Sequence, residues 1–64
     1  MKNRIRQERA EHDLSQAELA EKVKVSRQTI ISLETGKYIP STELALRLST
    51  VFGKTVNELF FLED

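Results

Sequence analysis

Residues 16–36 carry a regular pattern of small and apolar side chains that restricts the folds open to this chain. Small or apolar residues recur where two short helices, folded across a tight turn, would contact each other and a shared core: Leu19, Ala20, Val23, Val25, Ile30 and Leu33. Ser15 and Glu18 form a capping-box sequence that begins the first helix, and Ser26 caps the second. Gly36 ends the second helix, because a residue without Cβ readily adopts the left-handed conformation found after a helix.

The second of these helices has an outer face that differs from its core face. At about 100° per residue, four residues fall within one narrow arc: Gln28, Ile31, Ser32 and Thr35. Ile30 and Leu33 point the other way. The outer face begins with Arg27 and Gln28, whose donors can pair with base edges in a major groove. We therefore expect this face to contact double-stranded DNA.

The length and composition set further bounds. Sixty-four residues suffice for one compact domain with a small core, expected over residues 1–64. The absence of cysteine excludes a disulfide framework and fits a reducing cytoplasm. No apolar run has the length of a signal peptide or a membrane span, so we expect a soluble cytoplasmic protein without membrane association.

The charge balance is an objection to a nucleic-acid partner, because ten basic and ten acidic side chains cancel. The charges are nevertheless unevenly distributed. Residues 1–9 and residues 22–37 each hold four basic side chains and one acidic one, whereas residues 58–64 hold only acidic charges. This distribution favours positive potential on one surface at zero net charge. The alternative is an ordinary solvated surface of mixed charge.

Helical periodicity extends through the rest of the chain and predicts five helices and no strand. The first helix is expected over residues 2–12. Its inner side is expected to hold Ile5 and the stem of Arg9, with His12 as a further candidate.

Two helices are predicted in the C-terminal half. Residues 42–52 form the fourth, which ends at Gly53. A second capping box, from Thr55 to Glu58, opens the fifth. Its apolar side is expected to consist of Val56, Leu59 and Phe60.

His12, Asp13 and Ser15 are residue types found in hydrolytic triads. Residues so close along the chain cannot easily align a nucleophile, a base and an orienting acid. His12 is more simply an exposed residue at a helix end, where a protonated ring interacts favourably with the dipole. No metal-ligand cluster, glycine-rich phosphate loop or pair of catalytic carboxylates stands out. We expect no enzymatic activity, no cofactor and no metal site.

Phe60, Phe61 and Leu62 place three large apolar side chains in a row near the C-terminus. A short helix cannot bury all three, so we expect Phe61 or Leu62 to stay exposed in a monomer. The three residues either close the core or contribute to a homodimer interface, and we favour the interface. A two-fold dimer would place its two DNA-reading helices about one turn of DNA apart, near 34 Å.

Four motifs in this chain resemble the DNA-binding domain of the XRE family, which includes the lambdoid phage repressors and Cro. They are Leu14-Ser-Gln-Ala-Glu-Leu-Ala20, Val25-Ser-Arg-Gln-Thr-Ile30, Glu34-Thr-Gly-Lys37, and Pro40-Ser leading into Leu44-Ala-Leu46. Their order and spacing are similar to those of short single-domain bacterial and archaeal members. The resemblance implies a compact all-α, five-helix, lambda-repressor-like domain whose second and third helices form a helix-turn-helix.

The resemblance also implies roles for residues at matching positions. Gln16 matches a phosphate contact at a helix N-terminus, where spare amides and the dipole favour an anion. Arg27, Gln28 and Ser32 match positions that reach base edges. Gln28 suits adenine, and Arg27 suits guanine or a neighbouring phosphate. Lys37 matches a position that contacts the DNA backbone.

Other residues have more than one interpretation. Ile31 either contacts a thymine methyl group or fills the edge of the core. Tyr38 is expected to donate a phenolic hydrogen bond to phosphate. Arg9 and Glu34 match a partly buried ion pair in relatives, although Arg9 read alone suits a phosphate contact or a solvated surface charge.

Lys24 and Asp13 depart from the family pattern, since both stand where glycine is frequent. Lysine adopts the left-handed conformation with some strain, and aspartate adopts it more readily. We expect neither residue to break the fold.

These features together predict a homodimer that binds a symmetric DNA operator specifically and regulates transcription. Repression is favoured over activation, and no small-molecule effector is implied. The alternative is a protein-interaction module or antitoxin-type partner whose main ligand is another protein, bound through the C-terminal apolar region.

Overall fold

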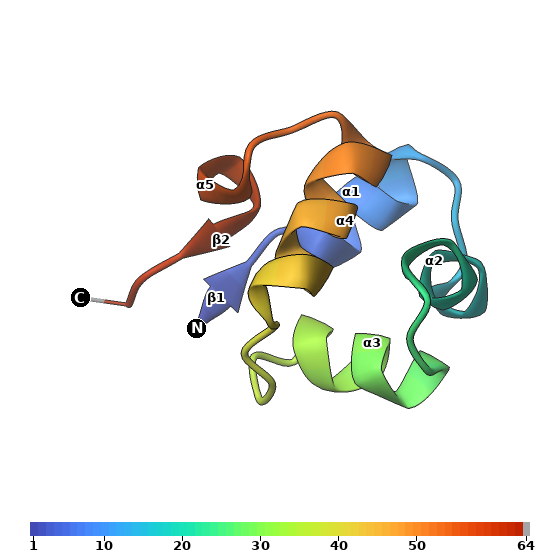
Figure 1. Cartoon of the computed structure of the whole chain (residues 1–64), viewed down its shortest axis with the longest axis horizontal. Coiled ribbons are helices and arrows are strands. Elements are labelled where there is room, and N and C mark those ends of the chain that lie inside the picture. The colour runs from blue at the N-terminus through green and yellow to red at the C-terminus, as the bar shows by residue number, and fades with distance from the viewer. Residues whose placement is uncertain (64) are drawn as a thin grey trace.

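The computed structural model describes residues 1–63, which form five helices and one two-stranded sheet (Figure 1). The elements in chain order are β1 (Lys2–Asn3), α1 (Ile5–Glu11), α2 (Gln16–Val23), α3 (Arg27–Glu34), α4 (Thr42–Phe52), α5 (Val56–Leu59) and β2 (Phe60–Phe61). The two strands lie side by side, on the side of the molecule opposite α2 (Figure 1). The predicted all-α class and the helix-turn-helix at α2 and α3 are confirmed.

Short polar side chains determine where four of the helices begin. The hydroxyl groups that accept a hydrogen bond from the backbone amide three residues later belong to Ser15, Ser26, Ser41 and Thr55. At α2 and α5 a second hydrogen bond runs in the opposite direction. The carboxylate of Glu18 accepts from the backbone amide of Ser15, and that of Glu58 accepts from the backbone amide of Thr55. Both predicted capping boxes are confirmed.

Left-handed residues determine where the chain turns. Lys24 (φ 61°) ends α2, and Asp13 (φ 58°) follows α1. Both residues stand where the family frequently has glycine, and both have the positive φ that was predicted for them. For Lys24 this conformation costs roughly 1–2 kcal/mol. Gly36 (φ 78°) follows α3, and a Cβ atom there would lie 3.2 Å from the Met1 carbonyl oxygen.

The core lies where α2 packs against both α3 and α4. Its buried apolar residues are Ile5, Leu19, Ala20, Val23, Ile30, Leu33, Leu44, Ala45, Leu48, Phe52, Leu59 and Phe60. The pattern in residues 16–36 is therefore a core pattern, with Val25 packed against the cluster as a partly buried residue.

The two ends of the chain differ from the prediction. The first helix begins at Ile5 and not at residue 2, because Lys2 and Asn3 pair antiparallel with β2. Lys2 lies opposite Phe61, and Asn3 lies opposite Phe60. Phe60 has extended backbone angles (φ −127°, ψ 142°), so it follows α5 as strand. The prediction of no strand is wrong, because pairing between the chain ends leaves no signal in local periodicity.

The inner side of α1 also differs from the prediction. Glu8 is fully buried, and its Oε2 lies 2.6 Å from Nζ of Lys54, in the loop after α4. This hydrogen bond raises the pKa of Lys54. His12 is exposed at the end of α1, and its ring packs at a tilt on Phe52 with centroids 5.1 Å apart. His12 is thus an exposed helix-end residue, as its simpler interpretation predicts. The charged residue on the inner side of α1 is Glu8, whose carboxylate is paired with Lys54.

Candidate nucleic-acid interface

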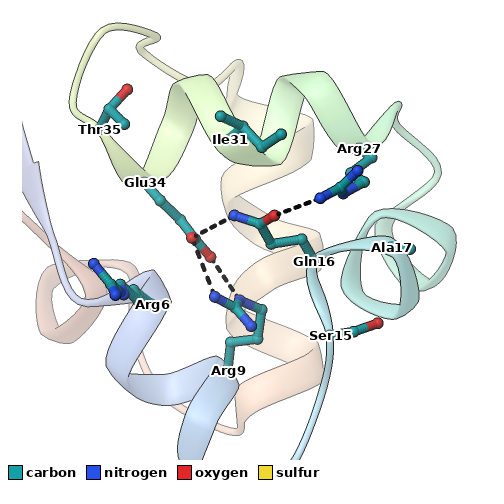
Figure 2. A pocket seen from close by; sticks show the side chains of 9 residues that line it. All are labelled: Arg6, Arg9, Ser15, Gln16, Ala17, Arg27, Ile31, Glu34 and Thr35. Carbon is teal, nitrogen blue, oxygen red and sulfur yellow. Dashed lines mark hydrogen bonds and ion pairs between the residues drawn. The ribbon is translucent and has the colours of Figure 1, made fainter.

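A groove of about 740 Å³ lies between the start of α2, the exposed face of α3 and one side of α1 (Figure 2). Its lining residues are Arg6, Arg9, Ser15, Gln16, Ala17, Arg27, Ile31, Glu34 and Thr35. The fold thus brings together residues from three helices that the sequence separates. The first amides of α2, which have no partner within the helix, are at the edge of this groove.

An ion pair forms the inner wall of the groove. Nε of Arg9 donates to Oε2 of Glu34 at 2.7 Å, and Nη2 of Arg9 donates to Oε1 at 3.3 Å. Nη1 of Arg9 donates to the carbonyl oxygen of Leu14 at 3.0 Å. The side chains of Arg9 and Glu34 are 18% and 6% exposed. Both residues thus join the end of α3 to α1, and three donors of Arg9 are used inside the protein.

The ion pair continues outward as a chain of hydrogen bonds (Figure 2). Nε2 of Gln16 donates to Oε1 of Glu34 at 3.2 Å, and Nη2 of Arg27 donates to Oε1 of Gln16 at 3.4 Å. The amide of Gln16 is therefore oriented from both sides. Gln16 and Arg27 have further N–H groups beyond those that these bonds use, so both can donate to a ligand in the groove.

The exposed surface of α3 consists of two adjacent stripes. Arg27, Ile31 and Thr35 are spaced four residues apart and line the groove. Gln28 is exposed and Ser32 is half-buried, and neither lines the groove. Ile31 is half-buried and faces the groove in Figure 2, where a ligand can reach it.

Lys37 and Tyr38 lie in the loop between α3 and α4, outside the groove. Both residues are exposed. The loop leaves α3 through Gly36, and the Lys37 amide donates to the carbonyl oxygen of Ser32 at 3.1 Å. The structure therefore separates these two residues from Gln16 and Arg27, which lie together.

Arg6 is a residue of this groove that the sequence reasoning did not single out. It is exposed on α1, and its side chain has no hydrogen bond or ion pair within residues 1–63. A signal for it was present, because it lies in the basic segment 1–9 and three residues before Arg9, on the same face of a helix.

A sequence profile of the family described as Helix-turn-helix matches residues 5–59. The chain belongs to this helix-turn-helix family. The resemblance to the XRE family, predicted from the four motifs, is confirmed.

Relatives of this helix-turn-helix protein occur in archaea and bacteria. An uncharacterized HTH-type transcriptional regulator of Methanocaldococcus jannaschii is 48% identical over 64 residues, which cover 100% of this chain and 97% of that protein. One from Archaeoglobus fulgidus is 47% identical over 64 residues, covering 100% and 91%. One from Bacillus subtilis is 41% identical over 64 residues, covering 100% and 97%.

The helix-turn-helix protein has a second, apolar groove of about 320 Å³ on the side of its strands. Phe60 is buried and belongs to the core, whereas Phe61 is 38% and Leu62 is 80% exposed. Both exposed residues line this groove together with Leu46 on α4, which is 56% exposed. We expected one of Phe61 and Leu62 to be exposed, and both are.

Residues 1–63 hold neither a candidate metal site nor a candidate membrane span. No group of three histidine, aspartate or glutamate side chains converges there in a way that could hold a metal ion. Among the helices of this part of the chain, none is both long and apolar enough to cross a membrane.

Proposed function

We propose that this protein is a cytoplasmic transcriptional regulator that binds double-stranded DNA at a specific sequence, through one domain spanning residues 1–64. α3 lies in the major groove, and the N-terminus of α2 contacts the phosphate backbone. The observation that carries the proposal is that Gln16 and Arg27 meet at 3.4 Å in one open groove. The names of the relatives support a regulator of transcription over an enzyme.

The residues of α3 read the bases in this proposal. Gln28 pairs with adenine through its amide, and Arg27 pairs with guanine or a neighbouring phosphate. Ile31 contacts a thymine methyl group from the wall of the groove, and Ser32 adds a hydroxyl group next to Gln28. Because Arg27 and Gln28 are both exposed in the first turn of α3, they enter the major groove first.

Four other residues contact phosphate in this proposal, and none of them reads sequence. Gln16 donates from the start of α2, and Lys37 and Tyr38 contact the backbone from the loop after α3. Arg6 joins them from α1, because it lines the same groove as Gln16 and is exposed. The zero net charge of the chain predicts a modest affinity for random DNA.

We further propose that the protein acts as a homodimer on a symmetric operator and represses by occupying it. Phe61 and Leu62 form the interface, and Phe60 supports it from the core. Exposed apolar side chains around one groove favour contact with another apolar surface. A two-fold axis near this groove gives two copies of α3 that read half-sites about 34 Å apart.

The same apolar groove supports a second candidate function. A module whose main ligand is another protein, such as an antitoxin-type partner, would use Phe61, Leu62 and Leu46 to bind it. DNA contact through α3 would then be secondary or absent.

Selection from a random duplex library with the purified protein, at near-physiological salt, separates the two candidates. The proposed function predicts enrichment of a symmetric motif whose half-sites lie about one helical turn apart. If no motif is enriched and binding is weak and salt-sensitive, the DNA-reading proposal fails and the protein-interaction module is favoured.

A further inference from the structure

Asn3 joins three segments of the molecule through one residue. Its Nδ2 donates to the carbonyl oxygen of Leu33, in the last turn of α3, at 2.8 Å. Its Oδ1 accepts from the backbone amide of Ile5, the first residue of α1, at 3.1 Å. Its own backbone lies opposite Phe60 in the pairing of β1 with β2. The side chain of Asn3 thus connects the DNA-reading helix to the strands at the chain ends.

Both ends of the Asn3 amide have a specific partner. The Leu33 carbonyl is one of the last carbonyls of α3, which have no partner within the helix, and it also accepts from the Gly36 amide at 3.1 Å. Arg4, which precedes α1, makes no side-chain cap bond, so Asn3 supplies the cap instead. An amide is suited to this position because it donates and accepts at once.

Backbone contacts of the two residues that flank β1 reinforce this connection. The Met1 carbonyl oxygen lies close to Gly36, where a Cβ atom would be 3.2 Å away. The Arg4 amide donates to the Leu59 carbonyl oxygen at 2.9 Å. β1 therefore lies between the end of α3 and β2, and β2 carries Phe61.

We propose that Asn3 is a positioning residue that holds α3 in a fixed place relative to the Phe61 and Leu62 surface, and thereby restricts the half-site spacing that the dimer accepts. This inference rests on the function and the dimer proposed above. A dimer presents two copies of α3 at one separation only if each copy of α3 is held firmly to the surface through which the protomers join. The bond from Asn3 to Leu33 is a direct side-chain link along this path.

Asn3→Asp tests the inference with a nearly isosteric change. The carboxylate still accepts from the Ile5 amide and is favourable at a helix N-terminus, but it cannot donate to Leu33. Gln7→Glu is the matched control, because it adds the same charge in the pocket that Gln7 shares with Asn3 and Gly36, near the end of α3, and leaves the bond from Asn3 to Leu33 in place. If Asn3→Asp does not fold, Asn3→Ser replaces it in every comparison below.

Two measurements are made on each protein. Amide hydrogen exchange without DNA reports on the end of α3, at Gly36 and Lys37. Titration reports the affinity for the selected duplex and for duplexes with a single base pair inserted or removed between the half-sites. For Asn3→Asp we expect exchange to accelerate about two- to tenfold, the range of one net hydrogen bond. We expect the affinity penalty for altered spacing to shrink by a similar factor of about two to ten, and Gln7→Glu to change neither quantity.

A spacing penalty in Asn3→Asp equal to that of the wild type overturns the inference, whatever the exchange rates. Unchanged exchange at Gly36 and Lys37 also overturns it, because α3 is then held without Asn3. Failure of the proposed function is seen separately and in the wild type, as the absence of any selected duplex. Without a selected duplex the role of Asn3 in half-site spacing is also wrong, and the wild type alone shows this before any variant is made.

Discussion

Nε of Arg9 lies 2.7 Å from Oε2 of Glu34, and this pair joins α1 to the last turn of α3. The same carboxylate accepts from the amide of Gln16, which in turn accepts from Arg27. One largely buried group thus stabilises the fold and orients two side chains of the candidate DNA surface.

Glu34→Gln should lower the free energy of unfolding by about 2–3 kcal/mol, somewhat below the range for a fully buried pair because Arg9 is partly exposed. The positive charge of Arg9 would be left without its partner. Urea unfolding measures the effect. Glu43→Gln is the control, because Glu43 is 74% exposed in its pair with Arg47 and should contribute less than about 1 kcal/mol. Equal small losses in both variants would contradict a structural role for Glu34.

Gln28→Ala should reduce the discrimination between the selected site and random DNA by about 1–3 kcal/mol, because a bidentate amide contact to adenine is lost. Titration of both duplexes at one salt concentration measures this difference. An equal loss of affinity on the two duplexes would show that Gln28 does not read a base.

Arg6→Ala and Lys37→Ala should each weaken binding to all duplexes, because each removes a phosphate contact. A plot of the logarithm of the binding constant against the logarithm of the salt concentration has a negative slope, and each variant should make this slope less steep by about 1. Affinities measured at several salt concentrations give this slope. Lys22→Ala is the control, since Lys22 lies on α2 outside the groove that contains Arg6. A similar change in slope for Lys22→Ala would indicate a general charge effect in place of a local contact.

The capping boxes predict a specific part of the acid sensitivity. Hydrogen bonds from the backbone amides of Ser15 and Thr55 lower the pKa values of Glu18 and Glu58 below their ordinary 4.5. A carboxyl group with a lowered pKa stabilises the fold above pH 4.5, and that stabilisation is lost as the pH falls through the lowered pKa. Glutamine keeps the capping bond without titrating. The double variant Glu18→Gln, Glu58→Gln should therefore show a shallower fall of Tm with acid than the wild type. If Tm falls with pH as steeply in the double variant as in the wild type, the two capping carboxylates are not the source of the acid sensitivity.

Leu62→Glu should raise the dimer dissociation constant by at least about tenfold, because burial of a leucine side chain contributes about 1.5–3 kcal/mol. Leu62 is 80% exposed, so the fold of the protomer should be preserved. Sedimentation equilibrium measures the constant. Ile39→Glu is the matched control, since Ile39 is 69% exposed but does not line the apolar groove. A wild type that stays monomeric at high concentration and on DNA would exclude the proposed dimer.

The helices of this fold can be predicted from the sequence because their signals are local. Ser15 with Glu18, and Thr55 with Glu58, mark helix starts within four residues, and apolar spacing marks the inner faces. The sheet cannot be predicted in this way. Its strands have two residues each and come from opposite ends of the chain, so only the folded structure brings them together.

The limits of prediction at the candidate site have the same cause. Gln16 and Arg27 follow from matching motifs, but their hydrogen bond to each other depends on how α2 crosses α3. Glu8 resembles a surface residue because its partner Lys54 is distant in sequence. Asn3 has a polar side chain in a basic segment, and its bond to Leu33 spans 30 positions of the sequence.

An NMR titration of the isotope-labelled protein with the selected duplex shows, residue by residue, whether the groove lined by α2 and α3 faces DNA. The proposal predicts that amide shifts concentrate at Gln16 and Ala17 and along the first turns of α3, and that the side-chain amide of Gln28 shifts as well. Shifts confined to the surface around Phe61 and Leu62, with α3 unchanged, would contradict the proposal.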